Sequence, residues 1–361
     1  MKIAVIGASG FVGLRLVEHL YLTGRAEVVP IVHTYRSLAV LARFPLPWRV
    51  TDPSNAAALG EALKGCDYVV HAALGDSSQI VSMAEALYPA AETAGIKRIV
   101  ALSSASVHSL TPAPGTDETT PILTSQKTEY NAAKAKAEVV LDSARRNGKV
   151  ELVQLRPSII HGPRSKLVAD LASQFLSRTA YLVDQGHGIC NAVSVDNLIE
   201  AIWVSLTKPE ADKNAFLVND REIVTWREFY AAIAAAVGAS MDEVHHVQAP
   251  EFRQSASEKL AKIAAAKPVL ATLPLVPARV KRLAKAAAAA WSPPGAPATW
   301  VLPEASRPRL TEEMCQLQNC RWRYPTAKAE QVLGFTPPLS FAESMQRTAA
   351  WLEFAGLTRK Q

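Results

Sequence analysis

Three side chains of this sequence have the types and spacing needed to move a proton at a carbon–oxygen bond. Tyr130 and Lys134 are four residues apart, so within a helix they lie on one face. A Lys ammonium beside a phenol lowers the pKa of the phenol, which makes the Tyr a usable general acid or base. Ser104 follows an apolar stretch upstream, and its hydroxyl can hold a substrate oxygen. These groups suit hydride chemistry at an alcohol or ketone carbon, with a nicotinamide as the redox partner.

A glycine-rich turn near the N-terminus predicts where a dinucleotide would bind. An apolar run over residues 2–6 leads into the spacing Gly-x-x-Gly-x-x-Gly, and an amphipathic pattern begins at Leu14. The order of strand, glycine loop and helix is the context that gives such a motif its meaning. Glycines allow a tight turn, and the N–H groups at the helix start face a pyrophosphate. The expected cofactor contacts in this turn are Gly7, Ser9, Gly10, Phe11, Val12 and Gly13.

The elements that position these residues follow from the hydrophobic pattern. The first half of the chain alternates strand and helix signals, which predicts a parallel sheet covered by helices on both faces. Strands are expected at 2–6, 27–32, 68–72, 98–102 and 151–155, and helices at 80–94 and 128–146. The second half is less regular, with a strand at 214–218, a helix at 226–237 capped by Thr225, and a final helix at 341–354. Ser104 then lies at the carboxyl edge of the sheet, where ligands of open α/β folds bind.

Bulk composition indicates an ordinary soluble globular protein. The 361 residues are 49% apolar and 20% charged, enough for one large domain or two unequal ones. The first strand is expected to begin at residue 2, which leaves no room for a signal sequence, and no apolar run approaches a membrane span. His245 and His246 lack acidic or Cys partners at ligand spacing, so no metal is predicted. Four scattered cysteines fit a reducing, cytoplasmic setting.

The motifs, taken in order, resemble those of extended short-chain dehydrogenases/reductases of the NAD-dependent epimerase/dehydratase family. The pattern comprises the glycine turn, a strand-end Ser, Tyr-x-x-x-Lys, and Arg156-Pro157 followed by Gly162-Pro163. Three further stretches resemble family signatures, at 71–73, 195–197 and 324–337. The resemblance covers about residues 1–250 and 322–356. It implies a Rossmann-type doubly wound parallel sheet, with 1–156 as the NAD(P)-binding domain joined by later strands, and 157–361 mainly as a smaller C-terminal substrate-binding lobe.

The resemblance also implies roles for individual residues. Tyr130 would be the acid/base, Lys134 would lower its pKa and hold the nicotinamide ribose, and Ser104 would orient the reacting oxygen. Ser104 is preferred among its neighbours because it lies three residues before Val107, where the family places its Ser or Thr. Further cofactor contacts are expected from Asp52, Ala72, Ala73, Tyr130, Lys134, Pro157 and Ile160. Substrate contacts are expected from His108, His161 and Arg164.

Cofactor preference is predicted from the end of the second strand. An acidic residue there would accept hydrogen bonds from a ribose 2′-hydroxyl and repel a 2′-phosphate. This chain has no acid directly after Val32, but it has Arg36, which can pair bidentately with a phosphate. The sequence therefore favours NADP, with NAD as the alternative.

The reaction predicted is oxidation or reduction of a secondary alcohol or ketone on a sugar-like or polycyclic small molecule. A nucleotide-sugar epimerase or dehydratase with transient hydride transfer is the enzymatic alternative, although the short loop after His71 argues against a standard sugar-nucleotide epimerase. The non-enzymatic alternative is an NADP-sensing binding protein, which has no need of a complete Ser-Tyr-Lys set. Whether the protein forms a homodimer is left open by the sequence.

One basic segment carries the net charge of +6. Residues 251–291 contain eight Lys or Arg and two acids, whereas the rest of the chain is balanced. This distribution does not describe a nucleic-acid binder. The favoured interpretation of the Ala/Lys/Pro-rich stretch 251–310 is a solvated flap over the substrate cleft, since prolines interrupt it. The alternative is an interfacial helix that meets a membrane surface.

Overall fold

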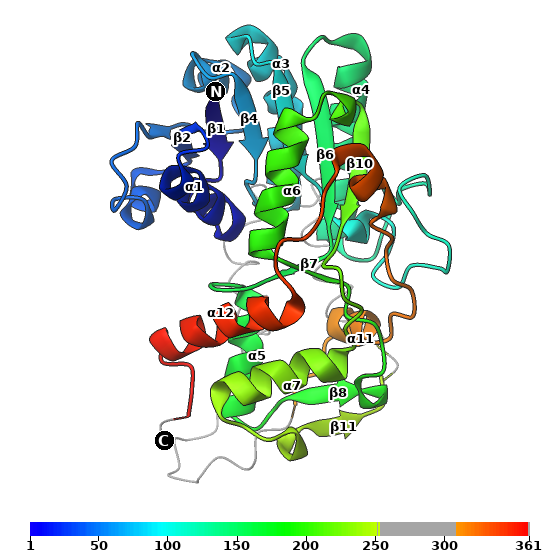
Figure 1. Ribbon diagram of the computed structural model, residues 1–361. Coiled ribbons are helices and arrows are strands. Elements are labelled where there is room, and N and C mark those ends of the chain that lie inside the picture. The colour runs from blue at the N-terminus through cyan, green and yellow to red at the C-terminus, as the bar shows by residue number, and fades with distance from the viewer. Residues whose placement is uncertain (251, 253–307, 360–361) are drawn as a thin grey trace, which may run out of the picture. The chain divides into compact units, whose positions relative to one another are not determined.

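The computed structural model describes residues 1–250, 252 and 308–359. In this part of the chain, seven strands form a parallel sheet in the order β10-β6-β5-β4-β1-β2-β3 (Figure 1). They are β1 (Lys2–Ile6), β2 (Glu27–Val32), β3 (Arg49–Val50), β4 (Tyr68–His71), β5 (Arg98–Leu102), β6 (Glu151–Pro157) and β10 (Asn214–Val218). The strand order reverses at β1, which makes its carboxyl end the switch point of a doubly wound sheet. The predicted Rossmann-type fold is confirmed.

Helices cover both faces of this sheet, as the alternation within the strands requires. Ile3 and Val5 of β1 belong to a core shared with α1 (Phe11–Thr23) and α6 (Val195–Thr207). Ala4 and Ile6 point to the opposite face, into a core shared with α2 (Ala56–Leu63), α3 (Ser77–Ala94) and α4 (Glu129–Asn147). Strands buried on both faces explain the nearly continuous apolar runs in the sequence.

The two apolar layers on the faces of the sheet are together called the first core. A second core lies around α7 (Trp226–Val237), where three large aromatic side chains, Trp226, Phe229 and Tyr230, are fully buried. The helices α5 (Lys166–Leu176) and α12 (Phe341–Phe354) pack in the same core. Two short sheets accompany it, one of β7 (Ile159–His161) with β9 (Ala192–Ser194) and one of β8 (Tyr181–Val183) with β11 (His245–Val247). The helix α11 (Glu312–Gln318) follows later in the chain.

Short helical turns link the larger elements. The 3-10 turns are η1 (Tyr35–Val40), η2 (Ala105–Val107), η3 (Asp184–Gly186), η4 (Pro209–Ala211) and η5 (Met241–Glu243), and η7 (Ala329–Leu333) is a π turn. The predicted Thr225 cap is confirmed, because its side chain accepts a hydrogen bond from the Glu228 N–H within a capping box. The helix expected at 80–94 begins three residues earlier, where Asp76 forms a capping box with Gln79.

The basic segment 251–291, for which a flap or an interfacial helix was the expectation, lies outside the described residues apart from Phe252. Among the helices that the structure does describe, none is long and apolar enough to cross a membrane.

Candidate active site

The glycine turn after β1 leaves no space for side chains at two positions. Gly7 has a φ of +82°, and a Cβ there would lie 2.6 Å from the backbone N and Cα of Ala73. Gly13 lies in the first turn of α1, and a Cβ there would lie 2.2 Å from the carbonyl oxygen of Gly7. The turn, the helix and the end of β4 therefore meet backbone to backbone, which is the close packing that a dinucleotide fingerprint requires.

The N-terminus of α1 is open for an anion. Within the described structure, its N-cap Gly10 provides no side-chain cap, and the first turn contains no acidic residue. The N–H groups of that turn can therefore face a ligand, and the helix dipole favours negative charge at the same place. This arrangement fits the pyrophosphate of a dinucleotide.

A cavity of about 530 Å³ opens beside this turn. It is lined by nine of the predicted cofactor contacts, namely Gly7, Ser9, Gly10, Phe11, Val12, Asp52, Ala72, Ala73 and Ile160. Other predicted contacts lie elsewhere: Gly13 packs beneath the turn, and Arg36 is exposed on η1. His33, Ser37, Thr51 and Ser54 line the cavity and were missed by the sequence analysis.

Asp52 is fixed where the chain leaves β3. The backbone N–H and the hydroxyl of Ser54 donate to its Oδ1 at 2.9 and 2.7 Å. These hydrogen bonds stabilise the carboxylate and hold the pKa of Asp52 below its usual value. Asp52 therefore presents a negative charge at the edge of this cavity.

A second cavity of about 250 Å³ contains the hydroxyls predicted to be catalytic, and it is called the catalytic cavity for that reason. Ser104, at the N-cap of η2, and Tyr130, in the first turn of α4, both line it. The Oγ of Ser104 lies 2.8 Å from the Oγ of Ser106 and accepts a hydrogen bond from the N–H of that residue. Ile160 lines both this cavity and the one beside the glycine turn, so the two cavities adjoin. Pro157, a predicted cofactor contact, lines the second one.

The pKa of the Tyr130 phenol is raised, whereas the sequence predicted that it would be lowered. Burial and the charge of Glu313 on α11 raise its pKa, while the Ser104 hydroxyl works in the other direction. Lys134 is not among the groups that shift it within the described structure. The expected lowering of the Tyr130 pKa by Lys134 is therefore not found, because the carboxylate faces the phenol and the ammonium points elsewhere.

Lys134 is buried behind the catalytic cavity. Only 7% of its surface is exposed, and its Nζ donates to the Leu102 carbonyl oxygen at 2.8 Å. Burial lowers its pKa to about 8, against the opposing charge of Glu138. A space of about 20 Å³, room for one water, lies between Lys134, Glu138 and His71. Burial, helped by the charge of Lys134, lowers the pKa of His71 to about 3, so its imidazole is neutral.

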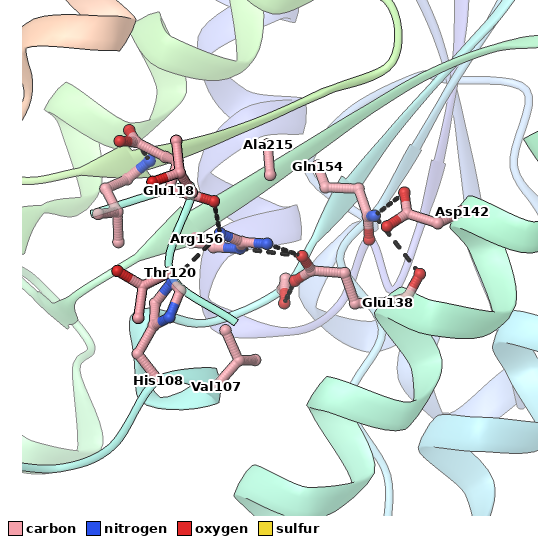
Figure 2. Close-up of polar contacts among 12 residues, drawn as sticks. Val107, His108, Glu118, Thr120, Glu138, Asp142, Gln154, Arg156 and Ala215 are labelled. Atoms are coloured by element: carbon pink, nitrogen blue, oxygen red, sulfur yellow. Dashed lines mark hydrogen bonds and ion pairs between the residues drawn. The ribbon is translucent and has the colours of Figure 1, made fainter. Parts of the chain in front are cut away.

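Glu138, one helical turn after Lys134, anchors a buried polar network (Figure 2). It accepts hydrogen bonds from the Ser103 hydroxyl at 2.6 Å and from the Nε of Arg156 at 2.9 Å. A second nitrogen of the same guanidinium also pairs with Glu138. The remaining Nη1 donates to His108 Nε2 at 3.1 Å and to the Glu118 carbonyl at 3.1 Å. The network joins α4, β6 and the segment that carries Ser103 and Ser104.

The three predicted substrate contacts are not brought to the catalytic cavity. His108 is buried and accepts a hydrogen bond from Arg156, and burial together with that charge lowers its pKa to about 4. His161 is fully buried, with its Nε2 3.0 Å from Asp220 Oδ2. Arg164 is exposed on a positive-φ turn. None of the three lines the cavity in this structure, whose lining comes from other residues, so their contact with a substrate stays a prediction.

Several lining residues were not among the predicted site residues, although Tyr324 begins a stretch that resembles a family signature. Asn191 precedes β9, and its amide oxygen accepts a hydrogen bond from the Tyr324 N–H at 3.0 Å. The Tyr324 hydroxyl lies 3.0 and 2.9 Å from the carbonyl oxygens of Ala105 and Ser109. Glu313 belongs to α11, about 180 residues after Tyr130 in the sequence. Glu138, which lines the small space behind this cavity, also carried a usable signal, since it continues the spacing of four from Tyr130 and Lys134.

Fold and site together define a Rossmann-type enzyme of the short-chain dehydrogenase/reductase type. Its sheet reverses order at the strand that leads into the glycine turn, and the two hydroxyls predicted to be catalytic line the adjoining cavity. The chain belongs to the NAD-dependent epimerase/dehydratase family, whose model matches residues 3–219.

Individual relatives show how widely this family has diversified. A UDP-glucose 4-epimerase of Vibrio cholerae is 27% identical over 256 residues, covering 65% of this chain and 76% of that protein. A decarboxylating sterol-4-alpha-carboxylate 3-dehydrogenase of Candida albicans is 28% identical over 261 residues, covering 62% and 72%. The crystal structure of a Bacillus cereus UDP-glucuronic acid 4-epimerase, in complex with UDP-glucuronic acid and NAD, has a TM-score of 0.68 at 16% identity, covering 98% and 100%. The similarity to this crystal structure, at 16% identity, concerns the fold alone.

Proposed function

We propose that this chain is an NAD(P)-dependent oxidoreductase that interconverts a secondary alcohol and a ketone. One observation carries the proposal: Ser104 and Tyr130 line one cavity, and that cavity meets the glycine-turn cavity at Ile160. A cofactor bound along the glycine turn would have its reactive end at this junction. The elements around the second core would then form the substrate lobe, with residues 1–156 as the main cofactor domain.

The bound cofactor would exchange a hydride with the reacting carbon of the substrate. Tyr130 keeps its proton at neutral pH because its pKa is raised, so it is prepared to donate that proton to a ketone oxygen during reduction. Ser104 would hold the same oxygen through its hydroxyl. Lys134, charged below about pH 8, would supply positive charge from the small space behind the catalytic cavity.

Of the two nicotinamide cofactors, we propose that the chain prefers NADP over NAD. The end of β2 presents His33 and Ser37 to the cavity, and Arg36 is on the same short turn. Neutral and basic groups tolerate a 2′-phosphate better than an acid would. The dissociation constants of NADPH and NADH for the intact protein decide this point, and tighter binding of NADH would contradict it.

An epimerase or dehydratase is the second candidate, because relatives with these activities share the family. Such an enzyme returns the hydride within one turnover, so it leaves the cofactor unchanged. A screen of candidate substrates that follows both product and cofactor absorbance separates the two. Net change in NAD(P)H supports the oxidoreductase, and turnover without it supports the epimerase or dehydratase.

The first prediction concerns Tyr130. Tyr130→Phe removes the donated proton and little else, so kcat should fall by at least about 100-fold while cofactor affinity stays near the wild-type value. Tyr21→Phe, an exposed phenol on α1 outside both cavities, is the matched control and should behave as wild type. Turnover of Tyr130→Phe at a rate close to wild type would contradict the proposed function.

A further inference from the structure

The charge of the catalytic cavity is unlike what an anionic substrate needs. Seven hydroxyl groups and two amides line it together with apolar side chains, and Glu313 is the charged residue of the lining. Among the described residues that line this cavity, none is a Lys or an Arg. A phosphate that left water for such a space would lose hydration without gaining a cation.

Glu313 is held in place by the start of α11. The Thr311 hydroxyl caps this helix by accepting a hydrogen bond from the Met314 N–H, which fixes the first turn. In the part of the chain that the structure describes, the adjacent Glu312 pairs with Lys127 at 2.9 Å, whereas Glu313 forms no ion pair. Glu313 also acts electrically on Tyr130, whose pKa it raises. Among the described residues, therefore, no Lys or Arg pairs with this carboxylate, which faces the same cavity as the acid/base.

We propose that Glu313 is a specificity-determining residue that selects substrates with a hydroxyl or ammonium donor and without phosphate at the catalytic cavity. A carboxylate accepts hydrogen bonds from such donors and attracts an ammonium through a charge-assisted bond. The same charge repels a diphosphate, which the uncharged hydroxyls and amides of the lining cannot offset. The substrate class is thus a neutral or amine-bearing alcohol or ketone with an apolar body. This inference rests on the proposed function for the position of the reacting carbon.

The test uses isothermal titration of the full-length protein saturated with its reduced cofactor. UDP-glucose is the anionic probe, and trans-4-aminocyclohexanol is compared with cyclohexanol as a pair that differs in one ammonium. The proteins are wild type, Glu313→Gln, Glu313→Lys and the control Glu312→Gln, which changes the neighbouring carboxylate outside the cavity. Circular dichroism verifies that each variant is folded.

Wild type should bind the amino alcohol about tenfold more tightly than cyclohexanol, which corresponds to one charge-assisted contact. Glu313→Gln should remove that preference, and Glu312→Gln should retain it. UDP-glucose should bind Glu313→Lys at least about tenfold more tightly than wild type, because the local charge changes sign.

Three results would overturn the inference. They are an amino-alcohol preference that survives in Glu313→Gln, the absence of any preference in wild type, and UDP-glucose affinity that is the same in wild type and Glu313→Lys. Because every reading is a binding constant, these results do not depend on turnover. Failure of the Tyr130→Phe prediction would remove the proposed reaction, whereas failure here would remove only the proposed selection.

Discussion

Lys134 shows how a single residue can be placed by its neighbours. Its ammonium has left water almost completely, and it is held by the Leu102 carbonyl oxygen at the end of β5. Desolvation disfavours the charged form, while Glu138 one turn later favours it. The balance leaves a lysine that titrates near the pH at which enzymes work.

This balance predicts a pH dependence. The pKa of Lys134 is lowered from 10.5 to about 8, so the ammonium is present below pH 8 and is lost as the pH rises above it. If the ammonium is needed, kcat/KM for the reduced cofactor should be level below pH 8 and should fall about tenfold per pH unit above it. That parameter reports groups of the free enzyme, to which this pKa belongs.

Steady-state kinetics between pH 6 and about 10 would show this fall, which we call the alkaline limb. Lys134→Met should lower kcat/KM in the level region below pH 8 and abolish the limb. A level profile up to about pH 10 in wild type would contradict the role of this charge. Glu138→Gln should move the limb to lower pH, because Glu138 raises the pKa of Lys134.

At the residue scale, the sequence predicted positions that depend on local spacing, but it did not predict that the pKa of Tyr130 is raised. Tyr130 and Lys134 share one helix face because they are four apart, and the sequence states that directly. His108 and His161 could not be placed, because what decides their role is burial against Arg156 and Asp220 from other elements. Glu313 had no local signal at all, since it meets Tyr130 only through tertiary structure.

At the scale of elements, the close packing of β1, its glycine turn and α1 requires glycine, because a Cβ atom would not fit. Gly13 has an ordinary helical conformation, so alanine is excluded by the neighbouring carbonyl and not by backbone strain. Gly60 in α2 gives the opposite case, because a Cβ there would have its nearest neighbour at 3.6 Å. The two glycines are therefore a matched pair for the same substitution within a helix.

Gly13→Ala should weaken cofactor binding by more than about tenfold, because the new methyl group must displace the Gly7 carbonyl and with it the turn. Gly60→Ala should leave cofactor binding unchanged and should stabilise the protein by up to about 1 kcal/mol through helix propensity. Fluorescence titration of the cofactor and thermal unfolding measure both effects. Equal cofactor affinities in the two variants would show that the close approach at Gly13 is unimportant.

Element-scale prediction from sequence was accurate for strands and less so for helix starts. The strands at 2–6, 27–32, 98–102 and 214–218 have the predicted bounds, because strands buried on both faces form nearly continuous apolar runs. Helix α3 was placed three residues late, since its first turn is polar and its start is defined by the Asp76 capping box. The two-residue strand β3 was missed because so short an element carries no periodicity.

At the scale of the molecule, α6 connects the core on the large sheet with the second core, around α7. Its N-terminal Asp196 pairs with Arg15 on α1, which covers the large sheet, at 2.5 Å. The same carboxylate pairs with Arg347 on α12, which belongs to the second core, at 2.7 Å. The sequence marked residues 195–197 as a family signature, but it could not show that Asp196 lies between two arginines from opposite ends of the chain.

Asp196→Asn should therefore lower the free energy of unfolding by about 1–3 kcal/mol at pH 7, since it removes the charge that both arginines share. Burial works against the charged carboxylate, but Arg15 and Arg347 outweigh it and hold the pKa of Asp196 below 3.8. A lowered folded-state pKa stabilises the protein above the unfolded-state pKa, and this contribution is lost as the pH falls through the folded-state value. The difference in Tm between wild type and Asp196→Asn should thus be level from about pH 5 to 8 and should narrow below about pH 4.

Asp170→Asn, which breaks an exposed pair with Lys166 on α5, is the control and should change Tm little. Calorimetry across this pH range tests the pair, and a difference that grows toward acid pH would contradict the assignment.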